Sequence, residues 1–168
     1  TGSSNITLTS TGSSTSEILS LSVTGTSLAP ATKAINSANI TAMRLNLTAG
    51  GEGMNISVIR LARNESAADA DLTNVRLIND TDADGAFDTS DEQIGPTINA
   101  TSGGEYIFGG LTYNVPAGGT KSLIVVVNTT AGTAGRTYRF NVNSTDFINT
   151  ISQTTALNTT ETLTTPLS

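Results

Sequence analysis

Short runs of alternating apolar and polar residues recur along the whole chain. Successive side chains of an extended strand point to opposite faces, so these runs predict strands that lay one face on a core. Leu19, Leu21 and Val23, for example, share one face of a strand at 17–24. The pattern predicts about ten short strands, drawn from the runs at 5–10, 17–24, 39–48, 55–62, 72–78, 94–100, 105–111, 112–115, 121–127, 136–142 and 147–157.

Glycine- and proline-rich turns separate these runs, as at 49–53 and 116–119. No stretch of ten residues has the apolar stripe of an amphipathic helix, and residues 63–71 carry none either. Strand number and spacing are typical of a sandwich, so we expect an all-β, jelly-roll-like β-sandwich. The length of 168 residues suits one domain.

The first run, "NITLTS", is separated from the rest by the spacer "TGSSTS". We therefore divide the chain into a detached strand with its spacer at 1–15 and a sandwich domain at 16–168. The strand either pairs with its own sheet as an edge strand or frays, or it adds to the sheet of an identical subunit. The second alternative builds a head-to-tail filament that does not close. Its donor strand consists of Asn5, Ile6, Thr7, Leu8 and Thr9.

Acidic residues concentrate in one segment, "DTDADGAFDTSD" at 80–91. Aspartates at positions 1, 3 and 5 and glycine at position 6 have the spacing of a calcium loop. Phe87 is expected to anchor the loop to the core. The flanks are strands rather than helices, and position 12 is Asp rather than Glu. We expect a structural Ca²⁺ clamp held by Asp80, Asp82, Asp84, the carbonyl of Ala86, Asp88 and Asp91; the alternative is a solvated acidic turn that binds nothing.

The composition excludes several classes of function. The net charge is −6 and the eight basic residues do not cluster, which argues against nucleic-acid binding. No apolar run is long enough to span a membrane. The chain has no His and no Cys, so histidine-based, triad and thiol catalysis are excluded, and the acidic residues outside the loop form no recognisable glycosidase pair. We therefore do not expect an enzyme.

Ten of the fifteen asparagines begin an Asn-x-Ser/Thr sequon. This excess predicts N-linked glycans and a location at the cell surface or outside the cell. The alternative is that Asn and Thr co-occur because both favour β-edges and turns. The polar start at Thr1 fits a mature form cut from a longer precursor. The sequons begin at Asn5, Asn39, Asn46, Asn55, Asn64, Asn79, Asn99, Asn128, Asn143 and Asn158.

The N-terminal strand, the segment "LTNVRLINDTDADGAFDTSDEQIG" leading to "YIFGGLTYNVPAGGTKSLIVVVNTT", and the dense sequons together resemble archaeal extracellular filament subunits of the donor-strand type. This group includes bundling pili, threads and biofilm-matrix fibres. The resemblance covers nearly the whole chain but contains no diagnostic motif. It implies a jelly-roll-like domain, a homopolymer assembled by strand complementation, and a role in adhesion or biofilm cohesion. Alternatives are a non-polymerising S-layer or adhesin domain and a calcium-dependent tube (cannula) subunit.

Overall fold

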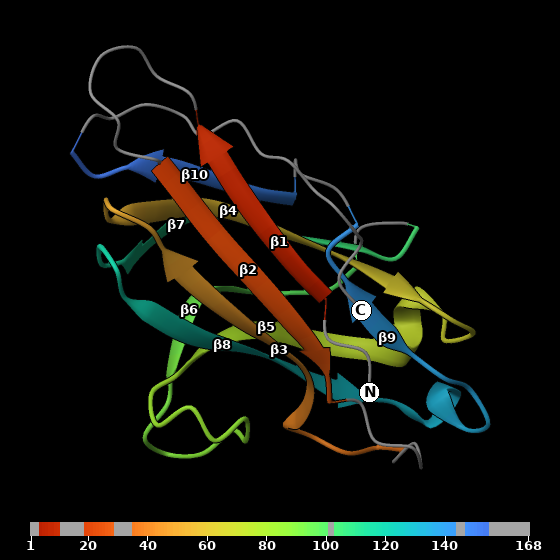
Figure 1. Cartoon of the computed structure of the whole chain (residues 1–168). Coiled ribbons are helices and arrows are strands. Elements are labelled where there is room, and N and C mark those ends of the chain that lie inside the picture. The colour runs from red at the N-terminus through yellow and green to blue at the C-terminus, as the bar shows by residue number, and fades with distance from the viewer. Residues whose placement is uncertain (1–3, 11–18, 29–34, 101–102, 144–146, 155–168) are drawn as a thin grey trace.

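The computed structural model describes residues 4–10, 19–28, 35–100, 103–143 and 147–154, which form two antiparallel sheets (Figure 1). The six-stranded sheet contains, in spatial order, β1 (Ser4–Ser10), β2 (Leu19–Ser27), β3 (Ile40–Ala49), β8 (Thr120–Thr129), β5 (Leu72–Asp80) and β6 (Glu92–Ile98). The four-stranded sheet contains β10 (Ile148–Ser152), β4 (Met54–Asn64) and β7 (Glu105–Val115), with β9 (Arg139–Asn141) also paired to β4. The expected all-β sandwich is confirmed.

The described helices are two short 3₁₀ turns, η1 (Asp69–Asp71) and η2 (Ala131–Thr133). In η2 the Thr130 side chain accepts a hydrogen bond from the Gly132 N–H, which caps the turn. No helix in the described part of the chain is long and apolar enough to cross a membrane.

The hydrophobic core lies between the two sheets and is made by the inward residues of the alternating strands. Leu21 and Val23 of β2 are fully buried in it, and so is Tyr106 of β7. The ring of Tyr106 meets that of Phe140 edge to face, with centroids 5.3 Å apart and planes at 68°. This geometry is one that aromatic pairs favour.

β8 lies inside the six-stranded sheet and is buried on both faces. Leu123 and Val125 belong to the core between the sheets. Ile124 and Val126, which alternate with them, join Ile78 of β5 in a second and smaller cluster. Since neighbouring residues of a strand point to opposite faces, this outer cluster lies on the side of the sheet away from the core.

The sequence divides residues 105–115 into two strands, and this division is wrong. Glu105–Val115 is one strand whose ladder with β4 is interrupted by a register shift opposite Ile56 and Val58. Gly110 lies inside the irregularity with a φ of 69°, a conformation that glycine adopts without strain. The bulge lets β7 bend while the ladder resumes on either side.

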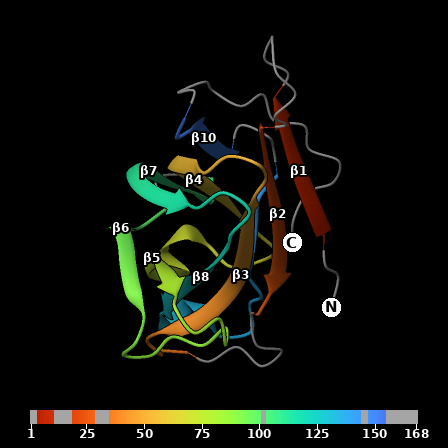
Figure 2. The ribbon, with the colours of Figure 1, turned by 60° about the vertical axis from the view of Figure 1, so that its left-hand side comes forward.

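The N-terminal strand is β1, and in the single chain it is an edge strand of its own sheet rather than a detached one. It pairs antiparallel with β2 over seven residue pairs, from Ser4 opposite Gly25 to Ser10 opposite Leu19. β1 lies at one edge of the six-stranded sheet and β6 at the other (Figure 2). The expected division of the chain at residue 15 falls outside the described residues.

Candidate metal centre and sheet edges

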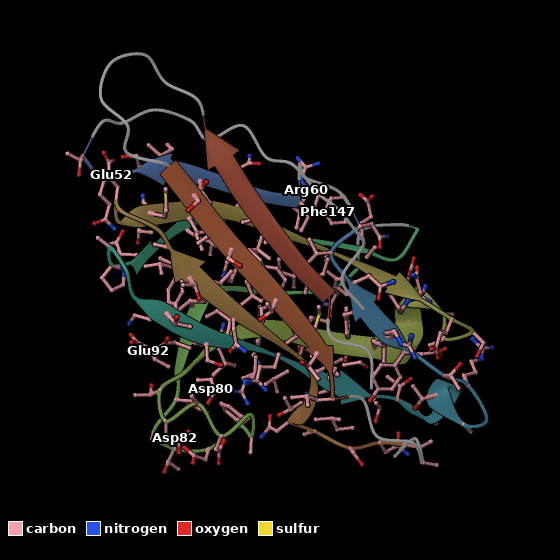
Figure 3. The ribbon with its side chains drawn as sticks, viewed as in Figure 1. Glu52, Arg60, Asp80, Asp82, Glu92 and Phe147 are labelled. Carbon is pink, nitrogen blue, oxygen red and sulfur yellow. The ribbon has the colours of Figure 1, made fainter. Side chains whose placement is uncertain are left out.

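The acidic loop connects two neighbouring antiparallel strands. Asp80 is the last residue of β5 and Glu92 the first of β6, and the ladder between these strands pairs Asn79 with Glu92. Figure 3 shows Asp80 and Asp82 together at this connection. The two strands therefore hold both ends of the loop in place, and the acidic residues between them fold back on one another.

The structure brings three of the predicted ligands together. One carboxylate oxygen from each of Asp80, Asp82 and Asp84 lies within 4.8 Å of the others. Asp82 and Asp84 are exposed, while Asp80 is buried. Three like charges at this separation repel one another unless a cation or protons neutralise them.

Asp80 provides the buried end of the cluster, and its side chain is fully shielded from solvent. Its Oδ2 accepts hydrogen bonds from the Ser122 hydroxyl at 2.7 Å and from the Gly85 N–H at 3.2 Å. Its Oδ1 is buried too, and no group in the described part of the chain donates a hydrogen bond to it. Burying a carboxylate oxygen without a hydrogen-bond donor costs free energy of folding. A bound cation would offset this cost by interacting with the oxygen.

Among the described residues, Arg44 of β3 is the basic residue within salt-bridge distance of Asp80. Its Nε lies 3.9 Å from Asp80 Oδ2, and its side chain is 30% exposed. The same Nε donates to Asn46 Oδ1 at 3.4 Å. The arginine thus faces the oxygen that already has donors.

The curl of the loop depends on Gly85 at position 6. Its φ is +82°, in the left-handed region where a side chain is disfavoured. The N–H of Asp84 donates to Asp82 Oδ1 at 3.3 Å, and that of Ala86 to Asp84 Oδ1 at 2.7 Å. These local turns aim the carboxylates at positions 1, 3 and 5 toward a common point, as the spacing predicts.

The other two predicted acidic ligands make different contacts. Asp88 accepts hydrogen bonds from the hydroxyl and N–H of Ser90, and these bonds lower the pKa of Asp88 below its ordinary value. Asp91 accepts from the N–H of Thr81 at 3.0 Å and from that of Asp88 at 3.1 Å. Asp91 therefore bridges the two halves of the loop, and neither residue belongs to the three-carboxylate cluster.

Phe87 anchors the loop, as the sequence suggests, but to the outer cluster and not to the core between the sheets. It packs, partly buried, against the cluster of Ile78, Ile124 and Val126. The guanidinium of Arg76 lies 5.1 Å from the centroid of its ring. This distance is within the range of cation–π attraction.

The donor set is suited to calcium. Ca²⁺ accepts six to eight oxygen ligands in flexible geometry, including carboxylates, backbone carbonyls and water. Asp80, Asp82, Asp84 and the carbonyl of Ala86 are the residues that would hold it, with water completing the shell. Asp80 is buried while Asp82 and Asp84 are exposed, so the cluster has one shielded and two solvent-facing carboxylates.

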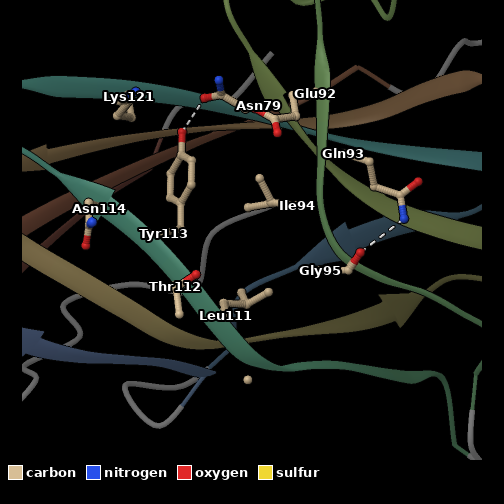
Figure 4. A pocket seen from close by; sticks show the side chains of 11 residues that line it. Asn79, Glu92, Gln93, Ile94, Gly95, Leu111, Thr112, Tyr113, Asn114 and Lys121 are labelled. Carbon is tan, nitrogen blue, oxygen red and sulfur yellow. Dashed lines mark hydrogen bonds between the residues drawn. The ribbon is translucent and has the colours of Figure 1, made fainter.

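A second feature is a groove of about 460 Å³ between the edge strands β6 and β7 (Figure 4). Ile94 and Leu111 form its apolar part, and the Tyr113 hydroxyl donates to Asn79 Oδ1 at 2.5 Å inside it. Lys121 Nζ lies 5.9 Å from the Tyr113 ring centroid. Burial, with a smaller contribution from the charge of Asp80, raises the pKa of Tyr113, so the hydroxyl stays a donor.

The predicted glycosylation sites differ in exposure. Exposed sequon asparagines are Asn39, Asn64, Asn99 and Asn143, and half-buried ones are Asn46, Asn55, Asn79 and Asn128. Asn158 lies outside the described residues, and the side chain of Asn5 is not among those described. Four sites are therefore open to a glycan as the fold presents them.

Sequence reasoning missed the residues that support the metal ligands. Ser122 of β8 contacts Asp80 although 42 positions separate them along the chain, and Arg44 approaches from β3. The ladder that pairs Asp80 with Ser122 creates the first of these contacts. The local sequence pattern does not indicate which strands are neighbours in the sheet. These two residues could be predicted only from a correct strand order.

Comparison of the chain with protein families, with curated proteins and with solved structures gave no match.

Proposed function

We propose that this protein is a structural subunit of an extracellular, glycosylated filament, which polymerises head to tail by donating its N-terminal strand to a neighbouring subunit. The observation that carries the proposal is the position of β1. Among the described strands it pairs with β2 alone, at the edge of the sheet, so one ladder holds it. An edge strand held in this way can be exchanged between copies while the sandwich stays folded.

The sequence of β1 supports the same proposal. Its two apolar residues lie opposite core residues of β2: Ile6 is paired with Val23 and Leu8 with Leu21. Val23 and Leu21 are fully buried. The register therefore places the two apolar positions of β1 opposite core residues, and a donated strand would combine this match with main-chain pairing.

In this function the acidic loop acts as a structural clamp. Ca²⁺ bound by Asp80, Asp82 and Asp84 ties the β5–β6 connection to the outer face of the sheet that receives the strand. Glycans on exposed sequons coat the outer surface and hinder random pairing of sheet edges. Adhesion or biofilm cohesion is the role that such a fibre serves, and its place is the cell surface.

A double substitution tests the proposal. Ile6→Asp with Leu8→Asp places two charges opposite buried apolar residues of β2, so we expect the strand to lose its affinity for the sheet. Electron microscopy of the full-length chain should show filaments, and the variant should show single particles with a β-sheet circular dichroism spectrum. A control variant, Asn5→Asp with Thr9→Asp, adds the same charge at the polar positions and should still polymerise.

Filaments of ordinary length from the Ile6→Asp, Leu8→Asp variant would refute strand donation.

One observation favours a second function: β1 pairs with β2 of its own chain. A self-contained copy is what a non-polymerising S-layer or adhesin domain with a structural calcium loop requires. Single particles from the full-length chain at all concentrations would support that function instead.

A further inference from the structure

We infer that the acceptor of the donated strand is the β2 edge of the next copy, the same position that β1 occupies in its own chain. This inference rests on the proposed function and adds the partner surface and its register. The ladder predicted between copies pairs Thr7 of one chain with Ser22 of the next, because Thr7 and Ser22 are partners within the single chain. Exchange of an identical element between copies requires no new complementary surface.

The residues that pair with one another lie in β1 and β2 themselves, so the pairing does not depend on the segment that connects the two strands. All seven residues of β1 have a partner on β2, from Ser4 opposite Gly25 to Ser10 opposite Leu19. A β1 strand from another copy therefore meets the same hydrogen-bonding edge and the same core residues, Leu21 and Val23. β2 contains no proline, so its edge is not interrupted.

The connection between β1 and β2 is longer than a hairpin needs. Eight residues separate Ser10 from Leu19, whereas two to five close most hairpins. Fully extended, eight residues span up to about 27 Å. Glycine, serine and threonine make up six of these eight, a composition typical of linkers. The connection is thus long enough for β1 to leave its own sheet and pair with another.

The opposite edge of the same sheet is a poor acceptor. β6 contains Pro96, which has no N–H to donate to an added strand. Its neighbour Gly95 has a φ of +70°, and a Cβ there would lie 2.5 Å from Leu111 Cδ2 of β7. β6 thus packs closely against β7 at Gly95 and carries a proline, and proline on an edge strand is one of the features that protect an edge from pairing.

The β1–β2 ladder within a chain and the proposed ladder between chains contain the same residue pairs. The subunit concentration therefore decides which of the two forms. A short linker of this composition holds β1 at an effective concentration in the millimolar range near its own β2. Exchange is therefore favoured when subunits are concentrated or already in contact. Each copy then gives one strand and receives one, which extends a head-to-tail chain.

The absence of cysteine from the chain allows a direct test. Thr7→Cys with Ser22→Cys places two thiols on partner residues, at a spacing that a disulfide can bridge. Assembled fibres are oxidised and then dissolved in denaturant without reductant. We expect a ladder of covalent multimers on a gel. Two comparison pairs, Thr7→Cys with Thr26→Cys on β2 and Thr7→Cys with Thr97→Cys on β6, should give few multimers.

Multimers from the β6 pair alone would overturn the inference and leave strand donation standing. A Thr7–Ser22 crosslink confined to single chains within fibres would overturn both the inference and strand donation. A second arm needs no fibre. A labelled peptide of residues 1–12 with Thr7→Cys is added to a chain that lacks residues 1–12 and carries Ser22→Cys. We expect saturable binding and a disulfide between the two introduced thiols, and binding without this disulfide, or no binding, would count against the β2 edge.

Discussion

At the scale of single residues, Asp80 determines the chemistry of the loop. It is the last residue of β5, and the ladder with β8 places it beside Ser122 in a shielded position. A buried carboxylate needs partners on both oxygens. Ser122, Gly85 and Arg44 all approach Oδ2, and the described residues give Oδ1 no donor. A cation held by Asp80, Asp82 and Asp84 would neutralise the like charges of this cluster.

Removing two exposed ligands should weaken this site without disturbing β5. For Asp82→Asn with Asp84→Asn we expect Ca²⁺ affinity, measured by titration calorimetry, to fall by roughly tenfold or more, because affinity follows the number of charged ligands. In the unaltered chain, Ca²⁺ at 100 times its dissociation constant should add about 2.7 kcal/mol to the free energy of unfolding. For a domain of this size that raises the melting temperature by roughly 5–10 °C relative to EDTA.

Glu105→Gln is a control outside the loop, since it removes one exposed charge on β7. It should leave both affinity and melting unchanged. Equal melting temperatures of the unaltered chain in Ca²⁺ and in EDTA would contradict the clamp.

The buried tyrosines predict how stability changes in alkali. Burial raises the pKa of Tyr106 to about 12 from the ordinary 10.0, and burial also raises the pKa of Tyr138. Between pH 10 and 12 the unfolded chain releases the Tyr106 proton while the folded chain keeps it. The stabilisation is therefore complete below pH 10 and is lost as the pH rises toward 12.

Tyr106→Phe removes this titration and retains the edge-to-face contact with Phe140. We expect urea unfolding between pH 10 and 12 to depend less steeply on pH in the variant, by about one proton per molecule. Tyrosinate absorbance of the folded protein should show the same late titration. Identical slopes for the two proteins would show that Tyr106 does not titrate late.

At the scale of elements, the strands were predictable because their signal is local. The alternation of Leu21 and Val23 with polar residues is present within nine residues of β2, and the loop spacing is present within twelve. Pairing is not local. The bulge at Gly110 and the contacts of Asp80 depend on which strands are neighbours, and so does the pairing of β1 with β2. The sequence therefore predicts the strands and the three clustered carboxylates. It does not predict the residues that contact Asp80 from other strands, Ser122 and Arg44.

Phe87 links the loop to the sheet as one unit. Phe87→Ala should remove its packing against Ile78 and Val126 and the contact with Arg76. We expect a loss of about 1–2 kcal/mol in the free energy of unfolding, since the ring is only partly buried. Ca²⁺ affinity should fall as well although no ligand is changed. Thr89→Ala in the same loop is the control and should leave Ca²⁺ affinity unchanged. Unaltered Ca²⁺ affinity in Phe87→Ala would show that the metal site does not depend on Phe87.

At the scale of the whole molecule, the edges of the sandwich are unequal. Pro96 and the close approach of Gly95 to Leu111 protect β6, while β1 covers β2 through one antiparallel ladder. The net charge of −6 makes bare subunits repel one another. In the proposed filament, bound Ca²⁺ would lower that charge in the loop. Assembly of the proposed filament then requires strand pairing that is specific enough to overcome the repulsion.

The most direct test of strand donation is electron microscopy of the full-length chain beside a chain that lacks residues 1–12, both at high concentration with Ca²⁺. The account predicts filaments from the full-length chain and single particles from the shortened one, with the same β-sheet spectrum for both. Filaments of equal length and number from the shortened chain would contradict it.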